Sequence, residues 1–296
     1  MYSEITHNKR KTWFLIIVMS TVVVGLSWLV GAMNGVDAGT SIIIGTIVAT
    51  IYSLVSYYSS DSIALSVSGA KRIEKRDSPD LYNLVENLCI ANGQTMPAVY
   101  IIDDPSPNAF ATGRDPEHAS IAFTTGIIRI LSREELEGVT AHELSHVKNY
   151  DIRVMTIVVV LVGLIALIAD VMLHLRFRGS RENNNGAAVF MIVGIILAIL
   201  SPIVAQIIQL AVSRSREYLA DASGALLTRY PEGLASALEK ISANGVPMRD
   251  PNHATAHLFI SNPFGATTKT RSFFNNLFST HPPIDERVAK LRAMGR

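Results

Sequence analysis

The strongest chemical signal in the 296-residue chain is a His-Glu-x-x-His motif at residues 142–146. Residues four apart lie on one face of a helix, so the imidazoles of His142 and His146 can reach one metal ion. Glu143 lies between them, where its carboxylate can take a proton from a water molecule. The motif therefore predicts a zinc site that activates water, with both histidines as ligands and Glu143 as the catalytic base.

The residues around the motif predict the helix that it needs. Ser132 followed by Glu135 is typical of a capping box at the start of a helix, and apolar residues then recur on one face from Leu136 to Val147. A pentapeptide of this kind also arises by chance, so a core helix with two incidental histidines is the plain alternative. A third ligand elsewhere in the chain would favour the metal site.

A catalytic zinc ion takes three protein ligands and one exchangeable water molecule. The segment 216–221 continues helically from the last apolar run and places Glu217 and Asp221 four residues apart on one face. We predict that Glu217 is the third metal ligand. We predict that Asp221 accepts a hydrogen bond from the free ring nitrogen of a ligand histidine, which fixes the tautomer of that histidine. A surface cluster of charged residues is the alternative interpretation.

The composition differs from that of an ordinary soluble protein, because 49% of the residues are hydrophobic, only 17% are charged and the mean hydropathy is +0.29. The net charge is only +1 and no basic stripe with interleaved aromatic residues is present, so we expect no nucleic-acid partner. Cys89 is the only cysteine, which excludes an intrachain disulfide and allows a reducing compartment.

Residues 13–33 and 41–58 are two uncharged runs, each long enough to cross the hydrocarbon core of a bilayer as a helix. Three basic residues precede the first run, none lies in the link, and four follow the second run between residues 71 and 76. By the positive-inside tendency, both ends of this transmembrane hairpin face the cytoplasm. A cleaved signal peptide is the alternative, although its apolar core would be shorter.

Residues 154–169 and 187–212 are two further apolar runs, which could also span a membrane with some tilt. Two crossings, or none, would return Glu217 to the side of the membrane that holds the motif. The link between the runs carries three arginines from residue 176 to residue 181, which is unusual for an external loop. Four spans and interfacial re-entry of these two segments therefore both remain open.

Outside the apolar runs, the chain has the pattern of a soluble domain that is mainly α with a small β-sheet. Residues 98–102 and 120–123 are predicted strands, and residues 108–113 could form another, so we expect a small sheet beside the motif helix. An extended substrate can add to the edge of such a sheet by backbone hydrogen bonds, and an edge that binds nothing is the alternative.

Four segments in this order resemble the HtpX-type membrane zinc metalloproteases, a bacterial family related to the CAAX prenyl proteases. The segments are residues 108–113, 141–149, 215–221 and 279–287. The resemblance extends over essentially the whole chain. It implies a gluzincin-type zinc peptidase domain integrated with about four transmembrane helices. It also implies one Zn²⁺ per chain, bound by His142, His146 and Glu217, with Glu143 as the general base.

The resemblance also implies partners and a location. It implies an endopeptidase that cleaves misfolded or damaged membrane proteins in quality control and stress response, with the bilayer and unfolded proteins as partners. The enzyme would be a multi-pass protein of the bacterial inner membrane whose active site faces the cytoplasm. The family motif at Asn108, Ala109 and Phe110 corresponds to the substrate-binding strand. His281 and Arg287 belong to a motif close to the active site, and the resemblance implies that they also bind substrate.

We accordingly expect two hairpins to alternate with two parts of one cytoplasmic peptidase domain. The expected segments are a transmembrane hairpin at 1–60, a first domain part with the motif helix at 61–153, a second apolar hairpin at 154–212, and a second domain part with the third ligand at 213–296. Because the apolar runs end close to the ligands in sequence, we expect the metal near the membrane surface, within about 10 Å.

Two rival functions come from other classes. A non-proteolytic membrane scaffold with a structural zinc site would close that site with four protein ligands, often including cysteine. The chain offers three plausible ligands and no cysteine near them, which favours an open coordination position. A transporter built on the four apolar runs would be expected to show internal repeat symmetry, which the sequence lacks.

Overall fold

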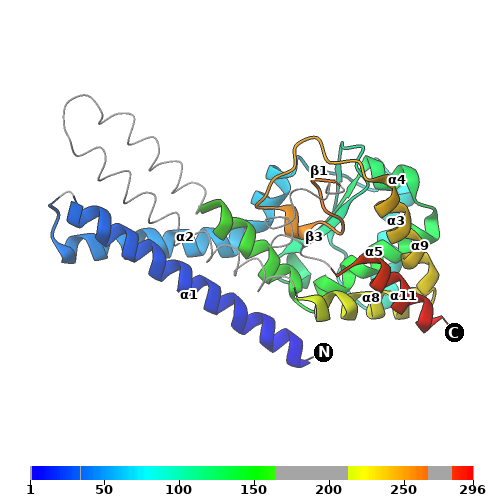
Figure 1. The fold of residues 1–296 in the computed structure, drawn as a ribbon, viewed down its shortest axis with the longest axis horizontal. Coiled ribbons are helices and arrows are strands. Elements are labelled where there is room, and N and C mark those ends of the chain that lie inside the picture. Colours follow the sequence, from blue (N-terminus) through cyan, green and yellow to red (C-terminus); the bar gives the residue numbers. More distant parts are fainter. Residues whose placement is uncertain (1, 34, 165–212, 266–281, 296) are drawn as a thin grey trace.

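The computed structural model describes residues 2–33, 35–164, 213–265 and 282–295. These residues form a long helical hairpin and a domain beside the end of the hairpin that carries the N-terminus (Figure 1). Residues 165–169 of the predicted run at 154–169, the whole predicted run at 187–212, and His281 lie outside the described residues, so the predictions made for them stay predictions.

The hairpin consists of helices α1 (Tyr2–Met33) and α2 (Ala38–Val67) (Figure 1). The predicted apolar run at 13–33 is part of α1, and the run at 41–58 is part of α2. The stretch Ile5–Ala32 and the whole of α2 are long and apolar enough to cross a membrane. Large apolar side chains cover the outside of the hairpin, and Ile17 and Ile43 are 62% and 61% exposed. Such a surface suits a lipid environment better than water.

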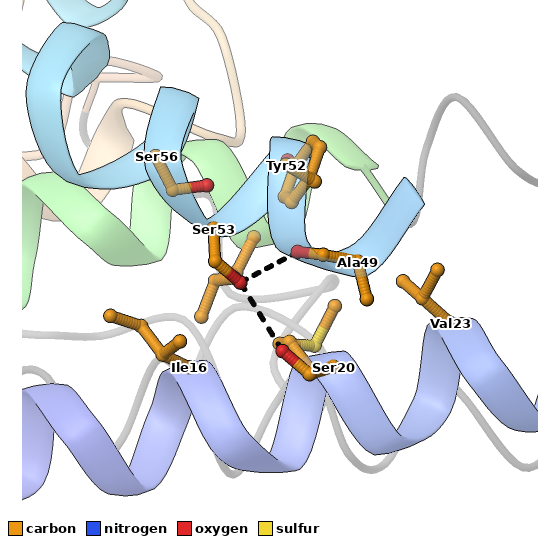
Figure 2. A pocket seen from close by; sticks show the side chains of 9 residues that line it. Ile16, Ser20, Val23, Ala49, Tyr52, Ser53 and Ser56 are labelled. Atoms are coloured by element: carbon orange, nitrogen blue, oxygen red, sulfur yellow. Dashed lines mark hydrogen bonds between the residues drawn. The ribbon is translucent and has the colours of Figure 1, made fainter. Parts of the chain in front are cut away.

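Hydroxyl groups join the two helices of the hairpin. Ser20 Oγ and Ser53 Oγ are 3.2 Å apart, and Ser53 Oγ also donates to the Ala49 carbonyl at 2.7 Å (Figure 2). These groups lie beside a small cavity lined by Ile16, Met19, Ser20, Val23, Ala49, Tyr52, Ser53, Ser56 and Leu161. The Tyr52 hydroxyl donates to the Val160 carbonyl and so ties the hairpin to the chain that follows the motif helix. Polar contacts of this kind hold helices together in apolar surroundings.

The domain contains a mixed sheet with the strand order β1-β2-β4-β3. Its strands are β1 (Lys71–Arg72), β2 (Ala98–Ile102), β3 (Ala109–Gly113) and β4 (Ala119–Thr124). Strands β2 and β4 are parallel, and the other two pairs are antiparallel. The three predicted strands are confirmed, and β3 lies at one edge. The two residues of β1 were not predicted, because they belong to a basic segment without strand character.

Helices cover the sheet and supply most of the core. They are α3 (Pro79–Asn92), α4 (Thr125–Ile130), α5 (Arg133–Lys148), an unlabelled helix over 151–164, α8 (Arg214–Thr228), α9 (Pro231–Asn244) and α11 (Ile284–Met294), with 3-10 turns η1 (Pro116–His118) and η2 (Ala256–Leu258). Buried residues such as Val85, Phe123 and Leu144 belong to one core cluster. The predicted class, mainly helical with a small sheet, is confirmed, and the described residues contain two candidate membrane helices.

Two glycines allow α8 and α9 to pack closely on α5. A Cβ atom on Gly224 of α8 would lie 3.0 Å from the backbone nitrogen of His142, and one on Gly138 of α5 would lie 2.6 Å from the backbone nitrogen of Leu234. Larger side chains would push the helices apart, because the interior has no room to absorb them. Glu217 lies two helical turns before Gly224, so this close contact brings it to the motif face of α5.

Candidate metal centre

The first two ligand candidates lie on α5, whose start is fixed by the predicted capping box. Glu135 Oε2 accepts a hydrogen bond from the Ser132 N–H at 2.7 Å, and Ser132 Oγ accepts one from the Glu135 N–H at 3.4 Å. The helix then runs through the interior, where His142 and His146 are 0% and 4% exposed. Buried imidazoles need polar partners, and both histidines have them.

Three ligand atoms from two helices converge in one place. His142 Nε2 lies 3.2 Å from His146 Nε2, and the Glu217 oxygens lie 3.8 Å from the first nitrogen and 3.5 Å from the second. A tetrahedral zinc ion with bonds of about 2.0–2.1 Å holds its ligand atoms roughly 3.3 Å apart. The arrangement therefore fits one zinc ion, and it brings together the three residues that the sequence predicted as ligands.

Each ligand histidine faces a carboxylate with its other ring nitrogen. His142 Nδ1 lies 2.9 Å from Asp221 Oδ1, and His146 Nδ1 lies 3.0 Å from Asp151 Oδ2. With the proton on Nδ1 in both rings, each Nε2 keeps a lone pair that points toward the metal position. The structure places Asp221 where the sequence analysis expected it. Asp151 was missed, since only a change of chain direction after α5 brings it back to His146.

Arg287 lies behind the metal centre, on α11. Its side chain is fully buried and donates to Asp221 through Nε at 2.8 Å and Nη2 at 2.7 Å. Its Nη1 lies 3.8 Å from Glu217 Oε2. Arg287 was predicted to bind substrate. In the structure its charge faces Glu217, a predicted metal ligand, and Asp221, which lies beside His142.

The electrostatics of the centre favour a divalent cation. Burial and the neighbouring Glu217 charge raise the pKa of Glu143 to about 8. Burial lowers the pKa of His142, whereas the hydrogen bond to Asp151 and the charge of Glu217 outweigh burial and raise the pKa of His146 to about 9. Asp151 and Glu217 lie 3.0 Å and 3.5 Å from the two ring nitrogens of His146, and a bound cation would relieve the repulsion between the acidic groups there.

Glu143, the predicted base, is closed off from solvent at 3% exposure. The backbone N–H of Ala111 on the edge strand β3 faces this carboxylate and lowers its pKa, which offsets part of the effect of burial. This contact places the base between the ligand histidines and the strand to which an extended substrate would add. Glu143 therefore lies at the position from which it can take a proton and pass it to a chain bound along β3.

The edge of β3 already carries backbone partners from the same chain. The Asn108 side chain donates to the Ser261 carbonyl at 2.9 Å and accepts from the Ser261 N–H at 3.1 Å. The Ile260 N–H donates to the Ala109 carbonyl at 3.0 Å, and the ring of Phe110 packs against Phe259. The three predicted substrate-binding residues thus lie together at the edge, but they are buried beneath the segment 259–261, which follows η2.

Comparisons with known proteins agree with this geometry. Residues 75–295 match the model of Peptidase family M48. The chain is 48% identical to a "Protease HtpX homolog" of Tropheryma whipplei (strain Twist), an alignment that covers 100% of this chain and 99% of that protein. It is 45% identical to the "Protease HtpX homolog" of Thermoanaerobacter pseudethanolicus, covering 99% and 98% of the two chains.

A solved structure shares the fold. The crystal structure of S. mikatae Ste24p superposes with a TM-score of 0.50 at 18% sequence identity, covering 98% of this chain and 67% of that one. At this level of identity the likeness concerns the fold alone. It includes the helical hairpin as well as the domain that holds the metal centre.

Proposed function

Because the chain belongs to peptidase family M48, and is a membrane metalloprotease, we propose that it is a zinc-dependent endopeptidase that cleaves misfolded or damaged membrane proteins. The convergence of His142, His146 and Glu217 beside the buried carboxylate of Glu143 is the observation that carries this proposal. We include in it one zinc ion per chain, a gluzincin-type domain with about four membrane spans, and a role in quality control under stress.

Zinc bound by the three ligands would supply a Lewis acid that lowers the pKa of a water molecule and polarises the scissile carbonyl. Glu143 takes the proton from that water and passes it to the leaving amine nitrogen. Asp151 and Asp221 hold the two imidazoles in the ligand tautomer through both steps. Arg287 keeps Asp221 ionised, since burial alone would raise the pKa of this carboxyl, whereas the hydrogen bonds from Arg287 and His142 lower it to about 2.

The active site faces the cytoplasm in this proposal, in a multi-pass protein of the bacterial inner membrane. Basic residues at 9–11 and at 71–76 flank the hairpin on the side where the domain lies (Figure 1). This asymmetry supports a cytoplasmic domain by the positive-inside tendency. A site held against the end of a membrane hairpin meets chains in or near the bilayer first, which supports membrane proteins as substrates.

An extended substrate binds along β3 by adding as an antiparallel strand. To do so it takes over the hydrogen bonds that Ile260 and Ser261 now make to Ala109 and Asn108. The same displacement brings the scissile bond beside Glu143, whose carboxylate already touches β3 at Ala111. The segment 259–261 therefore competes with substrate.

The proposal is tested with the full chain purified in detergent. Glu143→Ala should retain zinc and lose cleavage of a destabilised membrane protein by about 100-fold or more, because general base catalysis contributes that much. Glu137→Ala, on the same helix but outside the centre, is the matched control and should cleave normally. Normal cleavage by zinc-loaded Glu143→Ala would refute the proposal.

A further inference from the structure

The N-terminal end of α1 reaches the metal centre through one fully buried amide, that of Asn8. Asn8 Nδ2 donates to Asp151 Oδ1 at 2.7 Å and to the Asn149 carbonyl at 2.9 Å, so both amide protons are used. Asn8 Oδ1 accepts from Arg216 Nη1 at 3.1 Å, and the same nitrogen lies 3.4 Å from Asp151 Oδ1, so Asn8 completes a cluster of three side chains. A side chain of the first candidate membrane helix therefore contacts the residue that orients His146 and the residue that precedes Glu217.

Asn8 contacts the turn at residues 149–151, and the position of the Asp151 carboxylate depends on this turn. Asp151 follows His146 by only five residues, and its carboxylate reaches back to His146 because the chain turns sharply after α5. Tyr150 makes this turn with a φ of 61°, in the left-handed region that residues other than glycine rarely adopt. Such a conformation persists only where its surroundings hold it.

Helix α1 holds three consecutive residues of this turn. Asn8 bonds the Asn149 carbonyl and the Asp151 carboxylate, while the Lys9 ammonium lies 4.7 Å from the centre of the Tyr150 ring. A planar amide suits residue 8 because it offers two hydrogen-bond donors and an acceptor at once. Alanine offers none of these groups, and an ionised aspartate has no donors to give Asp151.

We propose that Asn8 is a positioning residue of the metal centre, so that the first membrane helix completes the site from outside its ligand shell. Asn8 fixes Asp151, Asp151 fixes the tautomer and direction of His146, and the strength of the metal bond follows. The inference rests on the proposed zinc function, and it adds that the hairpin is a part of the centre as well as an anchor.

The first test measures zinc release from the full chain in detergent into an excess of chelator. Asn8→Ala should release zinc about tenfold faster than the wild type, at the lower end of the range for partners of metal ligands. His7→Ala is the matched control, because His7 is exposed on the same turn of α1, and it should release zinc at the wild-type rate. In cleavage assays Asn8→Ala should lower kcat and leave KM unchanged.

A double variant shows whether Asn8 acts through Asp151. Asp151→Ala should release zinc faster than Asn8→Ala, and the double variant should release it no faster than Asp151→Ala, since coupled residues are not additive. Asn8→Asp keeps the shape and the acceptor for Arg216, and it should also release zinc faster if the donors matter. Wild-type release by Asn8→Ala or Asn8→Asp, or fully additive effects, would overturn the inference. A wild-type chain that binds no zinc would instead refute the proposed function.

Discussion

The two ligand histidines face carboxylates that are held by different sets of contacts. Asp221, beside His142, receives a bidentate ion pair from Arg287 near the C-terminus, with both hydrogen bonds at 2.7–2.8 Å. Asp151, beside His146, receives the neutral amide of Asn8 near the N-terminus at 2.7 Å and a longer contact of 3.4 Å from one nitrogen of Arg216. One aspartate is thus held by a side chain of α11 in the domain, and the other is contacted by a side chain of α1 in the membrane hairpin.

The two sides of the metal centre, His142 with Asp221 and His146 with Asp151, should therefore differ in how strongly they depend on the membrane hairpin. An ion pair between fully buried groups is costly to break, because each partner would be left as an unpaired charge. A neutral amide and an ion-pair contact of 3.4 Å, at a turn with a left-handed residue, are easier to disrupt than two short charged hydrogen bonds. We therefore expect the His142 half to be rigid and set by the domain, and the His146 half to depend on how the hairpin is seated.

The greatest loss of stability should follow from removing the ion pair on the His142 side. Arg287→Met should lower the free energy of unfolding by about 3–5 kcal/mol, because it leaves two buried carboxylates without their cation. Asn8→Ala should lower it by about 1–2 kcal/mol, the cost of unpaired polar groups. Thermal and denaturant unfolding in detergent measures both. Arg292→Met, on the exposed side of the same helix, is the control and should change little. Equal losses from the two halves would contradict the comparison.

The next effect concerns metal affinity. Asp221→Asn and Asp151→Asn should each weaken zinc binding by about 10–100-fold, the usual cost of removing a carboxylate behind a ligand histidine. Asp221→Asn should be the worse of the two, because it weakens two short charged hydrogen bonds from Arg287, whereas Asp151→Asn weakens a longer contact with Arg216. Competition with a chelator of known affinity measures the constants. Unchanged zinc affinity in either variant would show that the facing carboxylate does not orient its histidine.

The smallest effect concerns the access of substrate to β3, which should be independent of zinc binding. Ser261→Pro removes the N–H that bonds the Asn108 side chain, and it should raise the rate of cleavage by about two- to tenfold, the worth of one hydrogen bond. Ser261→Ala keeps this N–H and is the matched control. Zinc release should be unchanged in both variants. A slower Ser261→Pro enzyme with normal zinc binding would show that the segment 259–261 supports substrate binding.

The sequence predicted the parts of the site that local patterns encode. The motif on α5, its capping box and the spacing of Glu217 and Asp221 all follow from helical periodicity, and the structure brings these residues together. The strands beside the motif helix follow from their apolar composition. Each of these features depends on residues within a few turns of one another.

The remaining contacts join distant or irregular parts of the chain. Asn8 and Asp151 are 143 residues apart, and Asn8 adjoins a basic cluster that indicated only membrane orientation. Asp151 follows Tyr150, which has a left-handed backbone conformation. A glycine at this position would have indicated the turn in the sequence, but a tyrosine does not. Arg287 was predicted near substrate from its motif alone. A buried partner for it is not visible in any local pattern.

The most direct test of a catalytic zinc centre is X-ray absorption on the zinc-loaded full chain. We expect two imidazole nitrogens from His142 and His146, one oxygen from Glu217 and one exchangeable water oxygen, at about 2.0–2.1 Å. A shell closed by four protein ligands, or one containing sulfur, would contradict it and would indicate a structural zinc site in a membrane scaffold.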